Sequence, residues 1–284
     1  MNVLSHTEEL AVLTDENYYS DTTYLSTSRF KEYIECPARQ QMVDLGFWEG
    51  RKKTTALLLG NYVHSYFESM EAHKAFLEAE GQSLISSKGK TKGQLKAEFK
   101  VANKMIETLE REDLFLTLYN GSEGDDVRKE FIVTGNLYGI PFKAKIDSLN
   151  LSSGTFVDLK TMESIQKEAY STSLRRYVPQ ALCNIIEYRY DLQMFVYQQL
   201  LRQTFGYDLT PYIVAVSKET VPDKEIILVD DALLERGRQV FEANVDTIRN
   251  VLNGATIPER CGHCDYCLSN KHLTGFITID NLMY

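Results

Sequence analysis

Alternating apolar and polar positions in the middle of the chain predict β-strands. Successive side chains of a strand point to opposite faces, so a half-buried strand has a period of two. Turn-like segments at 135–139 and 152–154 separate three of these stretches, which predicts an antiparallel meander. The predicted strands are 131–133, 142–149, 155–159, 212–216 and 225–229.

Apolar side chains at helical intervals predict helices before and after this meander. Ser26 or Ser28 is able to cap a short helix over 29–34, which Pro37 ends. An excess of serine, lysine and glycine at 81–93 predicts a loop. The longer predicted helices begin near Thr55 and cover 94–112, 181–205 and 231–253. Helices around a meander of strands predict an α/β sandwich.

Length and composition indicate one elaborated domain. The chain has 284 residues, of which 43% are hydrophobic and 25% charged, which is enough for a large core. We expect an N-terminal extension at 1–23, the main domain at 24–256 and a cysteine-rich segment at 257–284. No run reaches the roughly 18 apolar residues that a membrane span needs, and the N-terminus is polar and acidic. We therefore expect a cytoplasmic protein that does not span a membrane.

The formal net charge of −9 argues against a surface covered in positive potential, although a nucleic-acid enzyme needs only a local basic lining. A solvated helix face or loop is the ordinary explanation of any single basic cluster. The candidate linings are the lysines between 88 and 104, Arg51 with Lys52 and Lys53, and Arg175 with Arg176.

Two of the predicted strands each contribute a carboxylate. Asp147 lies near the end of one, and Asp158 lies in the next with Lys160 two residues later, on the same strand face. Two acidic oxygens suit a hard divalent cation, and a nearby ammonium can hold or help to deprotonate an attacking water. An isolated Asp-x-Lys is usually a solvated strand face, so the interpretation depends on the neighbouring motifs.

Helical motifs flank the two carboxylate strands. Gly60 and His64 precede them with G-x-x-x-H spacing, and Gln193 and Tyr197 follow them with Q-x-x-x-Y spacing. In this order, over residues 24 to 270, the motifs resemble the PD-(D/E)xK nuclease superfamily, and within it the RecB-like and RecE-like exonucleases. The resemblance implies a restriction-endonuclease-like core, in which a central mixed sheet is flanked by helices.

The resemblance also implies roles for the motif residues. Asp147 and Asp158, with the backbone carbonyl of Leu159, would bind the catalytic Mg²⁺ or Mn²⁺, and His64 would supply a further ligand. Lys160 would orient the water. A lone histidine on an apolar helix is otherwise more often a core residue.

Four further side chains are candidates. By resemblance, Gln193 and Tyr197 would face the active site or the DNA backbone, although an aromatic-rich helix could equally use them for packing. Glu68 lies one helical turn after His64, and Glu130 lies on the strand before the carboxylate pair. These two are weaker metal-ligand candidates, for which a surface or structural ion pair is an equal explanation.

The cysteines predict a second metal centre. Three of the five form a C-x-x-C-x-x-C run at Cys261, Cys264 and Cys267, a spacing that lets thiolates converge on one metal. Cys36 is the candidate fourth ligand. Its Cys-Pro context resembles the N-terminal cysteine of AddB-type and CRISPR-associated nucleases, which implies a [4Fe–4S] cluster, although the C-terminal spacing here is tighter than in those relatives. Cys183, in an apolar helix, is expected to be a buried small hydrophobe.

Zinc is the alternative metal, with His263 or His272 able to replace one thiolate. Either metal would connect the first helix to the end of the chain. A disulfide is not expected in a chain that we place in the cytoplasm.

Residues 139–147 and 157–161 resemble most closely the RecE-like exonucleases of the exodeoxyribonuclease VIII type, found in phage and prophage recombination modules. The resemblance implies metal-dependent 5′→3′ digestion of one strand of linear duplex DNA, which leaves 3′ tails for a single-strand annealing protein. It also implies a homo-oligomer and a bacterial host cell. The alternatives are a CRISPR-adaptation-type iron–sulfur exonuclease acting on single-stranded ends, and a non-catalytic, metal-stabilised DNA-binding module.

Overall fold

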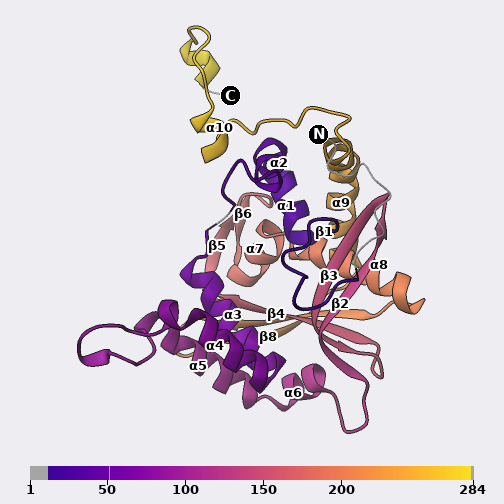
Figure 1. Cartoon of the computed structure of the whole chain (residues 1–284). Coiled ribbons are helices and arrows are strands. Elements are labelled where there is room, and N and C mark those ends of the chain that lie inside the picture. Colours follow the sequence, from indigo (N-terminus) through magenta and orange to yellow (C-terminus); the bar gives the residue numbers. More distant parts are fainter. Residues whose placement is uncertain (1–11, 51, 283–284) are drawn as a thin grey trace.

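A six-stranded mixed sheet forms the centre of the computed structural model, which describes residues 12–50 and 52–282 (Figure 1). Its strands follow the order β1-β3-β4-β7-β8, and β2 pairs with β3. Pairs β1–β3 and β4–β7 are parallel, whereas β2–β3, β3–β4 and β7–β8 are antiparallel. These strands are β1 (Leu25–Ser26), β2 (Val127–Leu137), β3 (Ile140–Asn150), β4 (Thr155–Met162), β7 (Thr210–Ser217) and β8 (Lys224–Leu228).

Helices cover both faces of this sheet (Figure 1). Alternation along the strands divides the core in two, so that Phe156 and Ile213 pack under α8 and α9 while Val157 and Val214 pack under α3, α5 and α6. The helices are α1 (Thr27–Glu35), α2 (Pro37–Asp44), α3 (Thr55–Glu68), α4 (Met70–Leu84), α5 (Ala97–Glu110), α6 (Asp113–Asn120), α7 (Gln180–Glu187), α8 (Tyr190–Phe205), α9 (Asp231–Leu252) and α10 (Asp265–Ser269). The predicted α/β fold with a central mixed sheet is confirmed.

One predicted helix boundary is incomplete and a second is wrong, both for backbone reasons. Helix α1 ends just before Pro37, as predicted, but Pro37 also begins α2, where its missing N–H is no loss because the first amides of a helix have no intrahelical partner. The helix predicted over 181–205 is interrupted at Arg189, which has a left-handed φ of 52° and separates α7 from α8. The Arg189 guanidinium pairs with Glu35 of α1, a contact that local sequence does not reveal.

The loop predicted at 81–93 is also only partly correct. Helix α4 continues through Gly81 to Leu84, and Ile85 then forms a bridge with Leu95 around the short 3₁₀ turn η1 (Gly89–Thr91). A two-stranded hairpin was not predicted at all: β5 (Glu168–Ser171) pairs with β6 (Arg176–Pro179) between β4 and α7. No helix of the described residues is both long and apolar enough to cross a bilayer.

The N-terminal residues that the structure describes lie against the sheet. The ammonium of Lys143, on β3, is buried and donates to the backbone carbonyls of Tyr18 and Asp21 at 2.6 and 2.8 Å. Lys145, two residues further on, pairs with Asp15 at 3.0 Å. The first part of the expected extension, 1–11, lies outside the described residues.

Gly237 is required where α9 crosses α8. A Cβ at this position would collide with the backbone carbonyl of Asp191 and stand 2.9 Å from the backbone nitrogen of Leu192. We expect Gly237→Ala to lower the free energy of unfolding by about 2–3 kcal/mol, because backbone atoms cannot rotate out of the way. Gly81→Ala is the matched control, since Gly81 is also helical but has open space around it and should gain up to about 1 kcal/mol. Urea unfolding measures both, and equal stability of the two variants would contradict the close crossing.

Candidate functional site

The site lies where β3 and β4 separate. Their backbone pairing covers only Asn150–Thr155 to Ser148–Val157, so Asp147 and Asp158 follow directly after the last pair. In place of a further ladder bond, the backbone N–H of Leu159 donates to Asp147 Oδ2 at 2.7 Å. The two carboxylates therefore lie near each other on neighbouring strands, as the meander predicted.

Asp158 is almost fully buried, at 2% exposure, among groups from β4 and α8. Lys160 Nζ is 2.5 Å from Asp158 Oδ2, and Gln193 Nε2 donates to Oδ1 at 2.6 Å. Gln193 Nε2 also lies 3.2 Å from the Tyr197 hydroxyl, so both residues of the Q-x-x-x-Y pattern reach the site. Asp158 Oδ2 is buried, and its charged neighbour is the Lys160 ammonium. Carboxylate oxygens are also ligands that hard divalent cations accept.

His64, Glu130 and Asp147 form a group that could hold a metal ion. Their ligand atoms all lie within 4.8 Å of one another, and His64 Nδ1 is 3.3 Å from Asp147 Oδ2. Two carboxylates and an imidazole are donors that Mn²⁺ or Mg²⁺ can accept. Asp158 is not part of this group, although its charge acts on Asp147.

Glu130 has a backbone that few residues adopt inside a strand. Its φ is 48°, in the left-handed region, where a non-glycine residue costs about 1 kcal/mol or more. It sits between the register pairs Lys129–Ser148 and Phe131–Ile146, which places it across from Asp147. Its carboxylate also pairs with Lys145 at 3.1 Å. The structural ion pair considered for Glu130 is therefore present, and the same carboxylate also belongs to the group that could hold a metal.

The pKa shifts of the group fit a cation-binding site. Burial, and then repulsion from Asp158, raises the pKa of Asp147 to about 7. Burial, and then Asp147, raises the pKa of Glu130 to about 7. The pKa of His64 is lowered by burial and by Lys160, which keeps the imidazole neutral and able to ligate. Glu68, at the end of α3, lies outside the group, and burial raises its pKa.

Lys160 is held in its charged form. Burial alone would lower its pKa, but the neighbouring groups, led by Asp158, raise it above its ordinary value. The ammonium also lies 5.0 Å from the centre of the Tyr190 ring, a cation–π distance. A lysine that stays protonated donates hydrogen bonds and offsets negative charge, and it does not act as a base.

Lys31 and Tyr190 were not assigned to the site from sequence. Lys31, on α1, donates to Gln193 Oε1 at 3.2 Å, which turns the Gln193 amide nitrogen toward Asp158. Its ammonium lies 5.4 Å from the Tyr190 ring, and burial together with Lys160 lowers its pKa to about 7. The available signal was the position of Lys31 on a short helix between the buried Phe30 and Tyr33.

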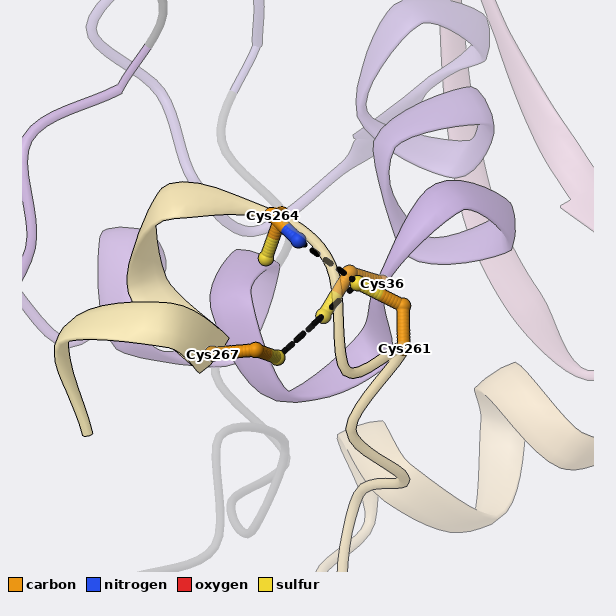
Figure 2. A group of neighbouring side chains, drawn as sticks. All are labelled: Cys36, Cys261, Cys264 and Cys267. Carbon is orange, nitrogen blue, oxygen red and sulfur yellow. Dashed lines mark hydrogen bonds between the residues drawn. The ribbon is translucent and has the colours of Figure 1, made fainter. Parts of the chain in front are cut away.

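The four predicted cysteines converge at the C-terminal end of α1 (Figure 2). Cys36 caps α1 and α2, and the other three come from the C-terminal segment around α10. Cys36 Sγ is 3.6 Å from Cys267 Sγ, Cys261 Sγ is 3.9 Å from Cys267 Sγ, and all four sulfurs lie within 4.8 Å of one another. Four thiolates in such a group fit a bound metal.

The histidines considered as alternative ligands are not part of this group. His263 Nδ1 lies 2.9 Å from the backbone carbonyl of Cys261, and His272 is exposed. Cys183 is buried on α7, away from the other four thiols, and its sulfur lies 3.7 Å from the carbonyl of Tyr170.

Comparisons with known proteins give the family. Residues 26–270 match the family described as "PDDEXK-like domain of unknown function (DUF3799)". A solved structure from Eubacterium rectale, described as a "putative exonuclease", has a TM-score of 0.81 at 33% identity, over 96% of this chain and 98% of that chain. The structure of SSO0001 has a TM-score of only 0.28 at 13% identity, over 85% of this chain and 92% of that chain.

No curated protein matches the sequence. The family match covers both carboxylate strands, both helical motifs and all four clustered cysteines. The chain therefore belongs to this PDDEXK-like family of the PD-(D/E)xK nuclease superfamily.

Proposed function

We propose that this nuclease is a metal-dependent exonuclease that digests linear duplex DNA from its 5′ ends and leaves 3′ single-stranded tails. The observation that carries the proposal is the buried Asp158 carboxylate, paired with the charged Lys160, next to the group of His64, Glu130 and Asp147. Four parts of the proposal rest on the resemblance to RecE-like enzymes: the 5′→3′ direction of digestion, a role in phage recombination, a strand-annealing partner and a homo-oligomer.

Each side chain of the site would have its own role in hydrolysis. A divalent cation, when bound, polarises the phosphodiester and lowers the pKa of a water. Asp147, Asp158, His64 and Glu130 would hold that cation, together with the Leu159 carbonyl. Lys160 positions the attacking water by hydrogen bonding and offsets the negative charge that develops on the phosphate. Gln193, held by Lys31, keeps the Asp158 carboxylate in place.

End-labelled DNA tests this proposal. Linear duplex labelled separately at its 5′ and 3′ ends is incubated with the protein and Mn²⁺ or Mg²⁺, with chelator, and with Asp158→Asn. We expect early release of 5′-terminal nucleotides that requires both metal and Asp158, while circular DNA is spared. Digestion restricted to single-stranded DNA would favour the CRISPR-adaptation type of exonuclease, and binding without any cleavage would favour the non-catalytic module.

Glu130 is proposed as a metal ligand because it keeps a strained backbone across from Asp147. Glu130→Gln should raise the Mn²⁺ concentration needed for half-maximal cleavage by about tenfold or more, since one charged ligand is lost. Glu68→Gln is the matched control, because this nearby carboxylate lies outside the group and should change that concentration little. Metal titrations of cleavage and of thermal stability measure the effect. A larger effect from Glu68→Gln would reverse the assignment.

We propose that the four cysteines hold one zinc ion in place of the iron–sulfur cluster that the resemblance implied. Tetrahedral zinc with Zn–S bonds of about 2.3 Å keeps its sulfurs about 3.8 Å apart. The Sγ–Sγ distances of 3.6 and 3.9 Å support that arrangement. In a [4Fe–4S] cluster each thiolate binds a different iron, so the sulfurs lie about 6 Å apart. Zinc content by elemental analysis, with no absorbance near 400 nm, is the expected result.

A further inference from the structure

The β5–β6 hairpin exposes two aromatic rings that contact each other edge to face. Tyr170 and Tyr177 are directly paired across the hairpin, with ring centres 5.3 Å apart, yet they are 52% and 67% exposed. Tyrosines used only to stabilise a hairpin are normally covered by a helix or a second sheet. The two rings instead form an exposed surface on which a base can stack.

Two arginines beside these rings have side chains without a partner among the described residues. Neither the Arg175 nor the Arg176 guanidinium forms an ion pair or hydrogen bond with them, and Arg176 pairs with Ser171 through its backbone. The other described arginines all bind a carboxylate or, for Arg260, a backbone carbonyl. In a chain of net charge −9, two adjacent guanidinium groups left open indicate an anionic partner from outside the chain.

The hairpin is braced, so these side chains are held in a defined position. Glu187 of α7 accepts hydrogen bonds from Ser171 Oγ at 2.6 Å and from the Ser173 backbone N–H at 3.0 Å. At the turn, Arg175 has a φ of 53°, a left-handed conformation that glycine or asparagine adopts more readily. An arginine in this unfavourable backbone conformation indicates a binding role for its side chain.

The hairpin connects directly to the cleavage site. Residues 163–167 alone separate it from β4, which carries Asp158 and Lys160. Tyrosines also line the way out of the site, because the exposed Tyr188 ring is 6.0 Å from Tyr190, whose ring lies 5.0 Å from Lys160 Nζ. Aromatic surface therefore extends from the site toward the exterior.

We propose that the β5–β6 hairpin holds the unpaired DNA strand next to the scissile phosphate. Tyr170 and Tyr177 stack on its bases, and Arg175 and Arg176 bind its phosphates. Stacking requires an open base face, so the occupant is a single strand and not an intact duplex. Two other charged residues lie at this hairpin: Glu168 is exposed, and Lys167 pairs with Glu219. The positive charge available for the phosphates therefore comes from Arg175 and Arg176. The proposal rests on the proposed function, because it assumes that the substrate is DNA.

Binding of a fluorescein-labelled single-stranded oligonucleotide tests the hairpin without cleavage. All variants are made in an Asp158→Asn background, and fluorescence anisotropy is measured over a range of salt concentrations. Tyr177→Ala should weaken binding about tenfold, whereas Tyr177→Phe should keep near-normal affinity because it retains the ring. Arg176→Gln should lower the slope of log affinity against log salt by about 0.7, the value for one phosphate contact on a single strand.

Matched controls are Tyr207→Ala, an exposed tyrosine just past the C-terminal end of α8, and Arg202→Gln, an exposed arginine in the last turn of α8. Equal losses in the controls, or unchanged binding by both hairpin variants, would overturn the proposal. Equal weakening of blunt duplex binding by Tyr177→Ala would overturn the assignment to a single strand. The two proposals can fail separately: a wild-type protein that cleaves no DNA yet binds it through Tyr177 supports the hairpin and contradicts the nuclease proposal.

Discussion

Asp158→Asn is expected to lower the rate of DNA cleavage on the order of 10³-fold while the protein stays folded. Asparagine keeps the shape of the side chain but removes the charge that a cation requires. The variant also removes the repulsion between the two carboxylates, which is one cause of the raised pKa of Asp147. The Lys160 ammonium still has the Asp147 carboxylate as a neighbouring group. Stability in the absence of metal should therefore change little.

Single-turnover cleavage and thermal unfolding, each with and without Mn²⁺, measure this result. Wild-type protein should gain stability from Mn²⁺ because the ion binds only the folded site, and Asp158→Asn should gain much less. Lys160→Ala should lose cleavage similarly but keep more of the stabilisation by Mn²⁺. Asp208→Asn, an exposed aspartate paired with Arg202, is the control and should match wild type. Loss of folding in parallel with activity would contradict a catalytic role.

Cys267→Ala is expected to release the bound metal and to lower the free energy of unfolding by about 3–5 kcal/mol. The Cys36–Cys267 contact joins residues 231 positions apart, so a metal held there removes much of the freedom of the unfolded chain. Tyr266 and Trp48 pack in the same small cluster, which has few other apolar contacts to retain it. The C-terminal segment should therefore detach from α1 and α2.

Zinc content, thermal unfolding and limited proteolysis after residue 256 measure the effect. Cys183→Ala is the matched control, since it removes a buried thiol that lies outside the four-cysteine group. It should keep all the metal and lose only about 1 kcal/mol. We expect cleavage by Cys267→Ala to fall less than its stability, because the four cysteines form a group separate from that of His64, Glu130 and Asp147. Full metal content in Cys267→Ala would disprove its role as a ligand.

Local pattern was sufficient for the parts of this protein that depend on short-range geometry. Period-two alternation predicted the meander, and it therefore predicted that Asp147 and Asp158 would be neighbours. The C-x-x-C-x-x-C spacing predicted convergent thiolates, because residues three apart in a tight turn face the same side. Ser26 caps α1 as one of two serines considered, by accepting from the Arg29 N–H.

Contacts between distant elements decided the rest. The position of Glu130 beside His64 and Asp147 depends on the β2–β3 register and on a strained φ, neither of which is visible in its own sequence neighbourhood. Arg189, where the helix is broken, pairs with the distant Glu35, and Gln193 accepts a hydrogen bond from Lys31, 162 residues earlier in the chain. Sequence alone determined that Asp147 and Asp158 lie on neighbouring strands, and it named the candidate side chains of the site. Only the tertiary structure decided which charges face each other, because pairing between distant residues is set by packing and not by local periodicity.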